Sequence, residues 1–484
     1  MGGKSPVRRI AGNTAVQVFG RAIEFAIFLF LVHYLDLKAF GAYTFILTNL
    51  MLWGVLADAG TYNVLIREAA GKANADRLLG NALTIGLFGS IAAILTSNAY
   101  LYFSGQGPET LVPALIASLT LFVSPRLNAF RRMFQVRFQS ELRMQYVVAW
   151  NTASHLLMAG LLVAVVLNKG LLAAIFCALI AAESLSFAGL CLTHRRLFKL
   201  PRFRFDPQIL RSLLRQSIPL MLAAICATVH DKIGIMLLEF IKSKEAVGLY
   251  NMAARIPDSL PFLATIFIGT VFPVMVRHRK TDPVAFDRIY RRSARYLLLF
   301  IVPIAGFCTL ASHDILNLLF PSRIPEAMFG HASRTLVLLI WAMVFKYMGT
   351  AFSFLIVAVS QEKRRLVCLG AAALLGIVLN ITLIPAHHIL GSATAVLIGS
   401  IAYPVAGLFF APLRKYAALL GAAAARPLLA TALTMLCVTL ITDHLLVAAV
   451  AGLLVYGALI LLFKGVTRED IALLKELRRE TGET

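Results

Sequence analysis

Charged side chains are scarce in this sequence, and acidic ones are the scarcest. Asp and Glu number 24 and Lys and Arg 46, which together make up 14% of 484 residues. Soluble domains carry about 25% charged residues. Hydrophobic residues reach 59% and the mean hydropathy is +0.79. Because no long polar stretch could form a soluble domain, the composition predicts an all-α, polytopic membrane protein.

The sequence also lacks the motifs that catalytic and metal sites require. There is no GxSxG, GxxxxGK[ST] or HExxH, and no DxD-type pair of acids in an expected outer loop. The six cysteines fall within apolar segments, without CxxC or Cys/His spacing suited to zinc. We therefore expect no enzyme activity, no metal and no cofactor.

Apolar segments of membrane-spanning length recur along the whole chain. At about 20 residues per span, they predict about 14 transmembrane helices. The predicted spans are 10–34, 42–66, 80–103, 111–125, 146–167, 171–193, 216–240, 246–276, 296–311, 334–358, 366–384, 390–412, 427–442 and 445–463.

Basic residues are divided unequally between the two sides of these spans. The connections on the side of the N-terminus carry 36 Lys and Arg, those on the other side carry 6, and 4 lie within spans. By the positive-inside rule, both termini are expected in the cytoplasm and the protein in the cytoplasmic (inner) membrane. The same loops are expected to contact anionic membrane lipids, and this distribution argues against nucleic acid as the partner.

The chain contains a short internal repeat. Phe40-Gly41-Ala42-Tyr43 and Val247-Gly248-Leu249-Tyr250 match at a constant offset, and at this offset Glu24 corresponds to Asp231. The alternative is a chance match. A parallel repeat of this kind places a substrate site between two lobes. We expect an N-terminal lobe of six helices over 1–205, a second over 206–413, and two additional helices with a cytoplasmic tail over 414–484.

Two segments outside the spans are expected to be helical. Asp206-Pro207 provides an N-cap and a first-turn proline, followed by leucines at helical spacing, which predicts an interfacial helix before the seventh span. The tail from Thr467 resembles a capping box and predicts a short amphipathic helix.

Four basic residues lie inside the predicted spans: Arg21, Lys232, Arg255 and Lys346. Polar residues share helix faces with two of them: Asn13, Gln17 and Glu24 with Arg21, and Asn251 and Asp258 with Arg255. A charge at the bilayer centre costs about 2.5–3.5 kcal/mol, so these side chains should face protein or a wet cavity. We expect the four cations, with Asn13, Gln17 and Asn251, to bind an anionic substrate. The alternative is internal salt bridges.

Acidic residues in the spans are candidates for ion coupling. Glu24, Asp231, Asp58 and Asp258 are the candidates, because a carboxylate in a dry cavity can carry a proton or bind Na⁺. The alternative is that each pairs with a nearby cation. Asp58 is also a candidate to cap a helix end. Pro257 and Pro261 flank Asp258 and are expected to break hydrogen bonding there.

Several segments resemble bacterial polysaccharide flippases, the Wzx-like branch of the multidrug/oligosaccharidyl-lipid/polysaccharide exporter superfamily. These are NTAVQVFGRAIEFAIFLFLVHYLDLKAFGAYTF (13–45), DAGTYNVLIREAAG (58–71), LLRQSIPLML (213–222), AVGLYNMAARI (246–256), FPVM (272–275) and LGSATAVLIG (390–399). In the second segment Ala59 replaces an aromatic residue and Thr61 an aliphatic one.

The resemblance implies two six-helix lobes around a V-shaped cavity, followed by two extra helices. It implies alternating access and flipping of an undecaprenyl-diphosphate-linked oligosaccharide, with cavity cations such as Arg21 and Arg255 accepting the headgroup. Coupling to H⁺ or Na⁺ and contact with polysaccharide-assembly proteins are further expectations. The alternatives are a multidrug or metabolite antiporter of the same superfamily, a membrane glycan polymerase or ligase, and a non-transporting scaffold.

Overall fold

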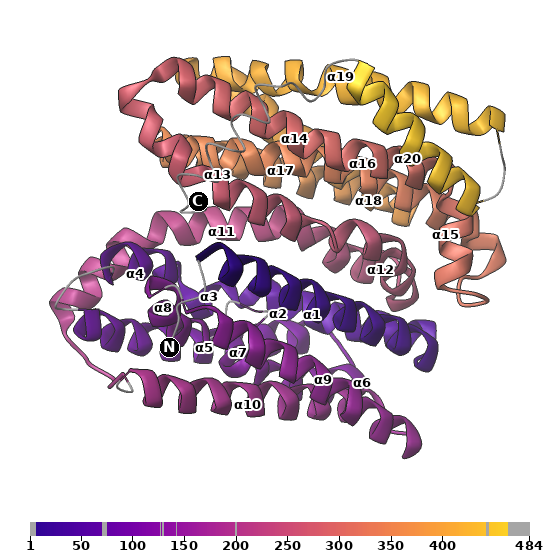
Figure 1. Ribbon diagram of the computed structural model, residues 1–484. Coiled ribbons are helices and arrows are strands. Elements are labelled where there is room, and N and C mark those ends of the chain that lie inside the picture. Colours follow the sequence, from indigo (N-terminus) through magenta and orange to yellow (C-terminus); the bar gives the residue numbers. More distant parts are fainter. Residues whose placement is uncertain are drawn as a thin grey trace. The chain divides into compact units, whose positions relative to one another are not determined.

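The computed structural model describes residues 6–69, 75–125, 127, 130–141, 143–198, 201–441 and 445–462, and within them it contains helices and no strand. The chain divides into two compact units, Met1–Lys232 and Ile233–Thr484. Figure 1 shows the order of the helices.

The helices of the first unit follow the predicted spans closely. They are α1 (Pro6–Tyr34), α2 (Leu37–Trp53), α3 (Val55–Asp58), α4 (Thr61–Ala69), α5 (Ala75–Phe103), α6 (Pro108–Ser118), α7 (Thr120–Val123), α8 (Arg132–Ser140), α9 (Gln145–Leu167), α10 (Leu172–Leu197) and most of α11 (Pro207–Ile241). Within this unit α9 packs against both α1 and α10.

The second unit continues from the end of α11. Its helices are α12 (Lys244–Asp258), α13 (Pro261–Thr281), α14 (Pro283–Leu310), α15 (Ser312–Leu319), α16 (Glu326–Ala358), α17 (Glu362–His387), α18 (Ile389–Ala406), the 3₁₀ turn η1 (Gly407–Phe409), α19 (Ala411–Ile441) and α20 (Leu445–Leu462). α16 packs against α12, α13, α14 and α18, so it lies at the centre of this unit.

The number of apolar helices agrees with the predicted number of spans. In the described part of the chain, twelve helices are long and apolar enough to cross a membrane, and two shorter apolar helices cover Pro108–Val123 and Val447–Leu462. Large hydrophobic side chains at the ends and sides of these helices are exposed, as with Phe103 (85%) and Leu440 (79%). Such exposure suits contact with lipid tails. The chain is therefore an all-helical, multi-pass membrane protein.

Helix boundaries repeat along the chain at the offset found in the sequence. The end of α1 at Tyr34 corresponds to the end of α11 at Ile241, and the end of α5 at Phe103 to the end of α14 at Leu310. The caps repeat as well. Asp36 Oδ1 accepts a hydrogen bond from Ala39 N (2.6 Å), and at the corresponding position Ser243 Oγ accepts one from Ala246 N (3.3 Å).

The offset is larger in the later helices. It increases between the starts of α6, at Pro108, and α16, at Glu326. The additional residues accommodate α15, which precedes α16 in the second unit. These shared boundaries support the internal repeat predicted from the two tetrapeptides.

Four predicted spans are divided between helices in the structure: 42–66, 111–125, 246–276 and 390–412. The span expected over 42–66 is interrupted at Gly54 and again between α3 and α4, where Ala59 (φ 47°) and Gly60 (φ 74°) are left-handed. A β-carbon at Gly60 would lie 2.7 Å from Ser217 O of α11, so this position requires glycine for both conformation and space. The span expected over 246–276 ends at Asp258 and restarts at Pro261, as the two prolines predicted.

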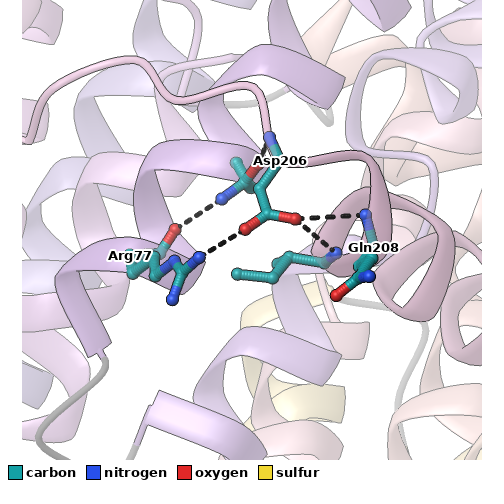
Figure 2. A network of polar contacts seen from close by, with 5 residues as sticks. Arg77, Asp206 and Gln208 are labelled. Carbon is teal, nitrogen blue, oxygen red and sulfur yellow. Dashed lines mark hydrogen bonds and ion pairs between the residues drawn. The ribbon is translucent and has the colours of Figure 1, made fainter.

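The linker before α11 is fixed to α5 by a polar network (Figure 2). Asp206 Oδ1 caps α11 by accepting from Gln208 N (3.1 Å) and Ile209 N (3.3 Å), and Oδ2 accepts from Arg77 Nη2 (2.6 Å). The Asp206 amide donates to Asn81 Oδ1 (2.7 Å). The predicted cap at Asp206 is therefore confirmed.

The helix predicted after this cap is present and leads into the seventh span without a break, while its interfacial position stays a prediction. Its residues form the first turns of the 35-residue α11, because no break follows the Asp206-Pro207 start. The segment 126–145, expected as a loop, contains the helix α8. The amphipathic helix predicted from Thr467 lies outside the described residues.

Candidate functional site

The polar stripe on α1 contains an ion pair between Arg21 and Glu24. Arg21 Nη1 lies 2.9 Å from Glu24 Oε2, with 57% of the Arg21 side chain and 16% of the Glu24 side chain exposed. Gln17 is exposed one turn earlier, and the side chain of Asn13 lies outside the described part of the chain. Because most of the Arg21 side chain is exposed while Glu24 is largely buried, the pair leaves part of the guanidinium accessible and shields the carboxylate.

The helix α9 adds two polar groups next to this stripe. A β-carbon at Gly20 would lie 3.3 Å from Thr152 Oγ1 and 3.5 Å from His155 Nδ1, so Gly20 allows α1 to approach these side chains closely. His155 is half-buried. The structure thus places the intramembrane histidine His155 beside the predicted stripe, with Thr152 as a neighbour that sequence reasoning had missed.

The corresponding segment of α11 is also polar. His230 is buried, Asp231 is exposed and Lys232 is half-buried. Asp231 lies as far before the end of α11 at Ile241 as Glu24 lies before the end of α1 at Tyr34. The two acids therefore occupy equivalent positions on equivalent helices.

In the second unit the predicted residues gather near the α12–α13 break. Asn251 and Arg255 are half-buried on α12, and Asp258 is exposed at the end of this helix. Tyr347 Oη of α16 donates to Leu260 O in the break (2.8 Å), and Lys346 precedes Tyr347. This bond joins α16, at the residue after Lys346, to the junction that follows Arg255.

Asp58 has a structural role in the first unit. It is buried, and its Oδ1 accepts from Tyr62 N (3.0 Å) at the start of α4. Its Oδ2 lies 3.2 Å from Arg132 Nη1, and the Arg132 guanidinium stacks 4.1 Å from the centre of the Tyr62 ring. Asp58 therefore caps a helix end, as one of its predicted roles required, and it pairs with a cation from α8.

A buried arginine network in the first unit was missed by the sequence analysis. Arg131, expected in a cytoplasmic loop, is 0% exposed. Its Nη2 donates to Asn151 Oδ1 (2.7 Å) and Ser186 Oγ (3.0 Å), and its Nη1 to Val123 O (3.2 Å). Ser124 Oγ bonds Glu183 Oε1 nearby (3.2 Å). Apolar residues at 130, 133, 134 and 138 were the signal that this loop packs inward.

The electrostatics of this network keep Arg131 charged. Burial lowers the pKa of the Arg131 guanidinium to about 10, while the carboxylate of Glu183 acts in the opposite direction. The guanidinium is therefore protonated at neutral pH and ties α7, α9 and α10 together. It is held by these bonds inside the unit, unlike Arg21, whose side chain is exposed.

Metal ligands do not cluster in the part of the chain that the structure describes. There is no group of three or more His, Cys, Asp or Glu residues that could hold an ion. The six cysteines are free thiols. The polar groups within the spans include guanidinium, ammonium, amide, carboxylate, imidazole and hydroxyl groups, which can bind anions, sugar hydroxyls or a proton.

Comparison with known proteins places this arrangement in a family. The model of the family described as "Polysaccharide biosynthesis protein" matches residues 7–278, which is more than half of the chain. The chain belongs to this family. No curated protein sequence matches it.

Solved structures show the same fold. The chain resembles the lipid II flippase MurJ in an inward closed conformation, with a TM-score of 0.75 at 14% identity, covering 93% of this chain and 98% of that one. It resembles an inward-facing multidrug resistance MATE transporter of the MOP superfamily (TM-score 0.61, 15% identity, 86% and 99% covered). The eukaryotic MATE transporter AtDTX14 is also similar (TM-score 0.62, 15% identity, 88% and 100% covered). The fold is therefore that of membrane transporters and flippases.

Proposed function

We propose that this protein flips a lipid-linked oligosaccharide, carried on undecaprenyl diphosphate, across the cytoplasmic membrane by alternating access. The observation that carries the proposal is the combination of a polysaccharide-biosynthesis family match with a transporter fold. A transporter in glycan synthesis needs a glycan precursor that must change sides of the membrane. A lipid-linked precursor meets this need, because its tail can stay in the bilayer while only the headgroup crosses.

The charged residues within the spans suit such a headgroup. Arg21, Arg255, Lys232 and Lys346 supply the cations that an anionic diphosphate requires, and an arginine can bind phosphate oxygens in a bidentate manner. Gln17, Asn251 and Asn13 supply amides for sugar hydroxyls and phosphate oxygens. Arg21 is the best placed, because more than half of its side chain is exposed while it is paired to Glu24.

Ion coupling is part of the same proposal. Glu24 and Asp231 occupy equivalent positions at the same distance from a helix end, so they are the first candidates to exchange H⁺ or Na⁺. Asp258 is the next candidate, since it is exposed at the α12 break. Asp58 ranks last because it already caps α4 and pairs with Arg132.

A second candidate function is multidrug or metabolite antiport. The likeness to MATE transporters favours it. Cationic drugs would call for a cavity of net negative charge, whereas each polar stripe of this chain has one arginine beside one acid, and Lys232 and Lys346 add positive charge within the spans. An enzymatic role is the weaker alternative, because the fold is that of transporters.

Reconstitution distinguishes these functions. Proteoliposomes receive a fluorescent oligosaccharide on a polyprenyl diphosphate, and an impermeant quencher reports its movement between leaflets. We expect the protein to accelerate this movement and leave a cationic dye such as ethidium untransported. Ethidium transport with no effect on the glycan lipid would replace the flippase by the antiporter.

The orientation of the chain has its own test. We propose that both termini are cytoplasmic, because basic residues are concentrated on that side. Single cysteines near Lys242 should then react with an impermeant reagent in intact cells, while those near Arg204 should react only after lysis. The reverse pattern would overturn the orientation and leave the fold unaffected.

A further inference from the structure

The linker Pro201–Asp206 and the first turns of α11 form an exposed surface of alternating arginine and aromatic residues. Arg202, Phe203, Arg204 and Phe205 follow one another in an extended segment, with Phe203 55% and Phe205 74% exposed. Arg211 and Arg215 are exposed one helical turn apart on α11. The acid of this segment, Asp206, is already engaged by Arg77 and by the α11 amides, so it does not neutralise the four arginines.

The contacts of the linker fix this surface in place. Arg204 N donates to Gly80 O (3.2 Å), and Arg204 O accepts from Thr84 Oγ1 (2.8 Å). A β-carbon at Gly80 would lie 2.4 Å from Arg202 O, so the linker lies directly on α5. Phe203 stacks on Phe130, with ring planes 3° apart and centroids 6.1 Å apart. The four arginines therefore project from a rigid backbone.

Helix lengths place this surface at the edge of the bilayer. α5 has 29 residues and α11 has 35, so they extend about 43 and 52 Å. The hydrocarbon core is about 30 Å thick. Both helices are therefore longer than the hydrocarbon core, and polar residues lie in the part that extends beyond it at the linker end. These residues are Asp76, Arg77 and Asn81 on α5, and Arg211 and Arg215 on α11. The linker crosses α5 at Gly80–Thr84, where the polar end of that helix meets its apolar part.

We propose that this surface, Arg202–Phe205 with Arg211 and Arg215, binds the phosphate headgroups of anionic phospholipids. The arginines pair with lipid phosphates, and Phe205 inserts its exposed ring among the upper acyl chains. A bilayer is the occupant that matches both features, since it offers anionic charge and an apolar layer side by side. The surface fastens the start of α11 to the membrane.

The test measures lipid enrichment at this surface, with no glycan lipid present, so its result is independent of the proposed transport. The full chain, with its six cysteines replaced and Gln208→Cys carrying a fluorophore, is reconstituted in phosphatidylcholine containing a minor fraction of phosphatidylglycerol. Nitroxide-labelled versions of the two lipids then quench the fluorophore. A matched control carries the fluorophore at Tyr102→Cys, which is exposed at the opposite end of α5.

We expect phosphatidylglycerol to quench position 208 at least about fivefold more effectively than phosphatidylcholine at low salt, corresponding to one arginine–lipid contact or more. At position 102 the two lipids should quench equally. The quadruple variant R202Q/R204Q/R211Q/R215Q should lose the difference at 208, whereas R288Q/R291Q, which removes two exposed arginines of the second unit, should keep it.

Phe205→Ser should weaken quenching by both lipids at 208, since the segment would rise toward water. Gel filtration checks that each variant is folded. Equal quenching by the two lipids at 208 in the unmodified background would overturn the proposal, as would a difference that survives the quadruple variant. Quenching at 208 by aqueous iodide alone would place the linker in water and overturn it as well.

Discussion

Both units break their second span at one equivalent place, by different chemistry, and the first unit has a second break. In the first unit α2 ends at Trp53, just before Gly54. Two left-handed residues, Ala59 and Gly60, then separate α3 from α4 at a second break, whose counterpart in the repeat, Phe267, lies inside α13. In the second, α12 ends beside Pro257 and α13 starts at Pro261, the position that corresponds to Gly54 in the repeat. The sequences have diverged so far that glycine in one copy is replaced by proline in the other. The break at Gly54 and Pro261 is what both copies retain.

The glycine and proline breaks differ in how much they depend on neighbouring helices. Gly60 is needed because its backbone touches α11 and adopts a conformation that other residues resist. Pro261 stands at the first position of a helix, where a missing N–H costs nothing. We therefore expect the break at Ala59–Gly60 to be sensitive to substitution and the break at Pro257–Pro261 to be tolerant.

The largest effect on stability is expected at a buried arginine of the first unit. Arg131→Leu should lower the free energy of unfolding by roughly 3–5 kcal/mol, because it removes a buried cation that offsets the charge of the Glu183 carboxylate and leaves the hydrogen-bond acceptors Asn151 Oδ1 and Val123 O without their donor. Arg279→Leu in the second unit is the matched control. Arg279 bonds Val359 O (3.1 Å) and Ser360 Oγ (3.0 Å) at the end of α16 and is only half-buried.

In the Arg279→Leu control the free energy of unfolding should fall by far less, about 1 kcal/mol, because water can replace the Arg279 guanidinium as the donor at the helix end. Thermal unfolding in detergent measures both variants. Equal losses for the two arginines would show that the Arg131 network does not depend on its burial.

Gly60→Ala should come next. The β-carbon would meet Ser217 O at 2.7 Å and Met221 N at 2.9 Å in a left-handed conformation, which predicts a loss of roughly 2–5 kcal/mol. Gly105→Ala isolates the conformational part, since Gly105 has φ 72° and no atom within 4 Å of the added carbon. It should cost about 1–2 kcal/mol. A Gly60 variant no less stable than the Gly105 variant would contradict the close approach to α11.

The double substitution Pro257→Ala/Pro261→Ala should cost less than about 1 kcal/mol, because alanine restores backbone donors and is the best helix former. It should also let α12 and α13 approach one continuous helix. Spin labels at exposed positions on the two helices would then report a changed separation. A large loss of stability would mean that the proline break is as constrained as the glycine break.

The smallest effect is expected at the linker. Hydrogen bonds from the Ile209 and Gln208 amides and from Arg77 lower the pKa of Asp206 below its ordinary value. Its contribution to stability is therefore complete above about pH 4 and is lost as the pH falls through the lowered pKa. Asp206→Ala should lower the melting temperature at pH 7 by less than Gly60→Ala does, and the difference from the unmodified chain should shrink toward pH 3.

Features that depend on a few neighbouring residues could be predicted from the sequence, whereas contacts between distant helices could not. Span positions, the Asp206 cap and the Pro257–Pro261 break follow from hydropathy and from backbone chemistry within a few residues. The burial of Arg131 could not be predicted, because its partners Asn151 and Ser186 belong to α9 and α10. The left-handed Ala59 was missed because alanine gives no local signal for that conformation.

The candidate site shows the same limit. The α1 stripe was predicted from its spacing, and the Arg21–Glu24 pair was one of the two interpretations considered. The approach of His155 and Thr152 to Gly20 depends on how α1 packs on α9, which spacing within one helix does not determine. The roles of Arg21, Lys232, Arg255 and Lys346 in binding remain predictions.

The most direct test of the central claim is glycan-lipid flipping by charge variants in proteoliposomes. Arg21→Ala/Arg255→Ala should reduce the flipping rate at least tenfold, and Arg→Lys at both positions should restore part of it if charge dominates over bidentate contact. The double variant Arg288→Ala/Arg291→Ala, which removes two exposed arginines outside the stripes, should flip at the unmodified rate. Flipping at the unmodified rate by Arg21→Ala/Arg255→Ala would contradict a role for these cations in holding the headgroup.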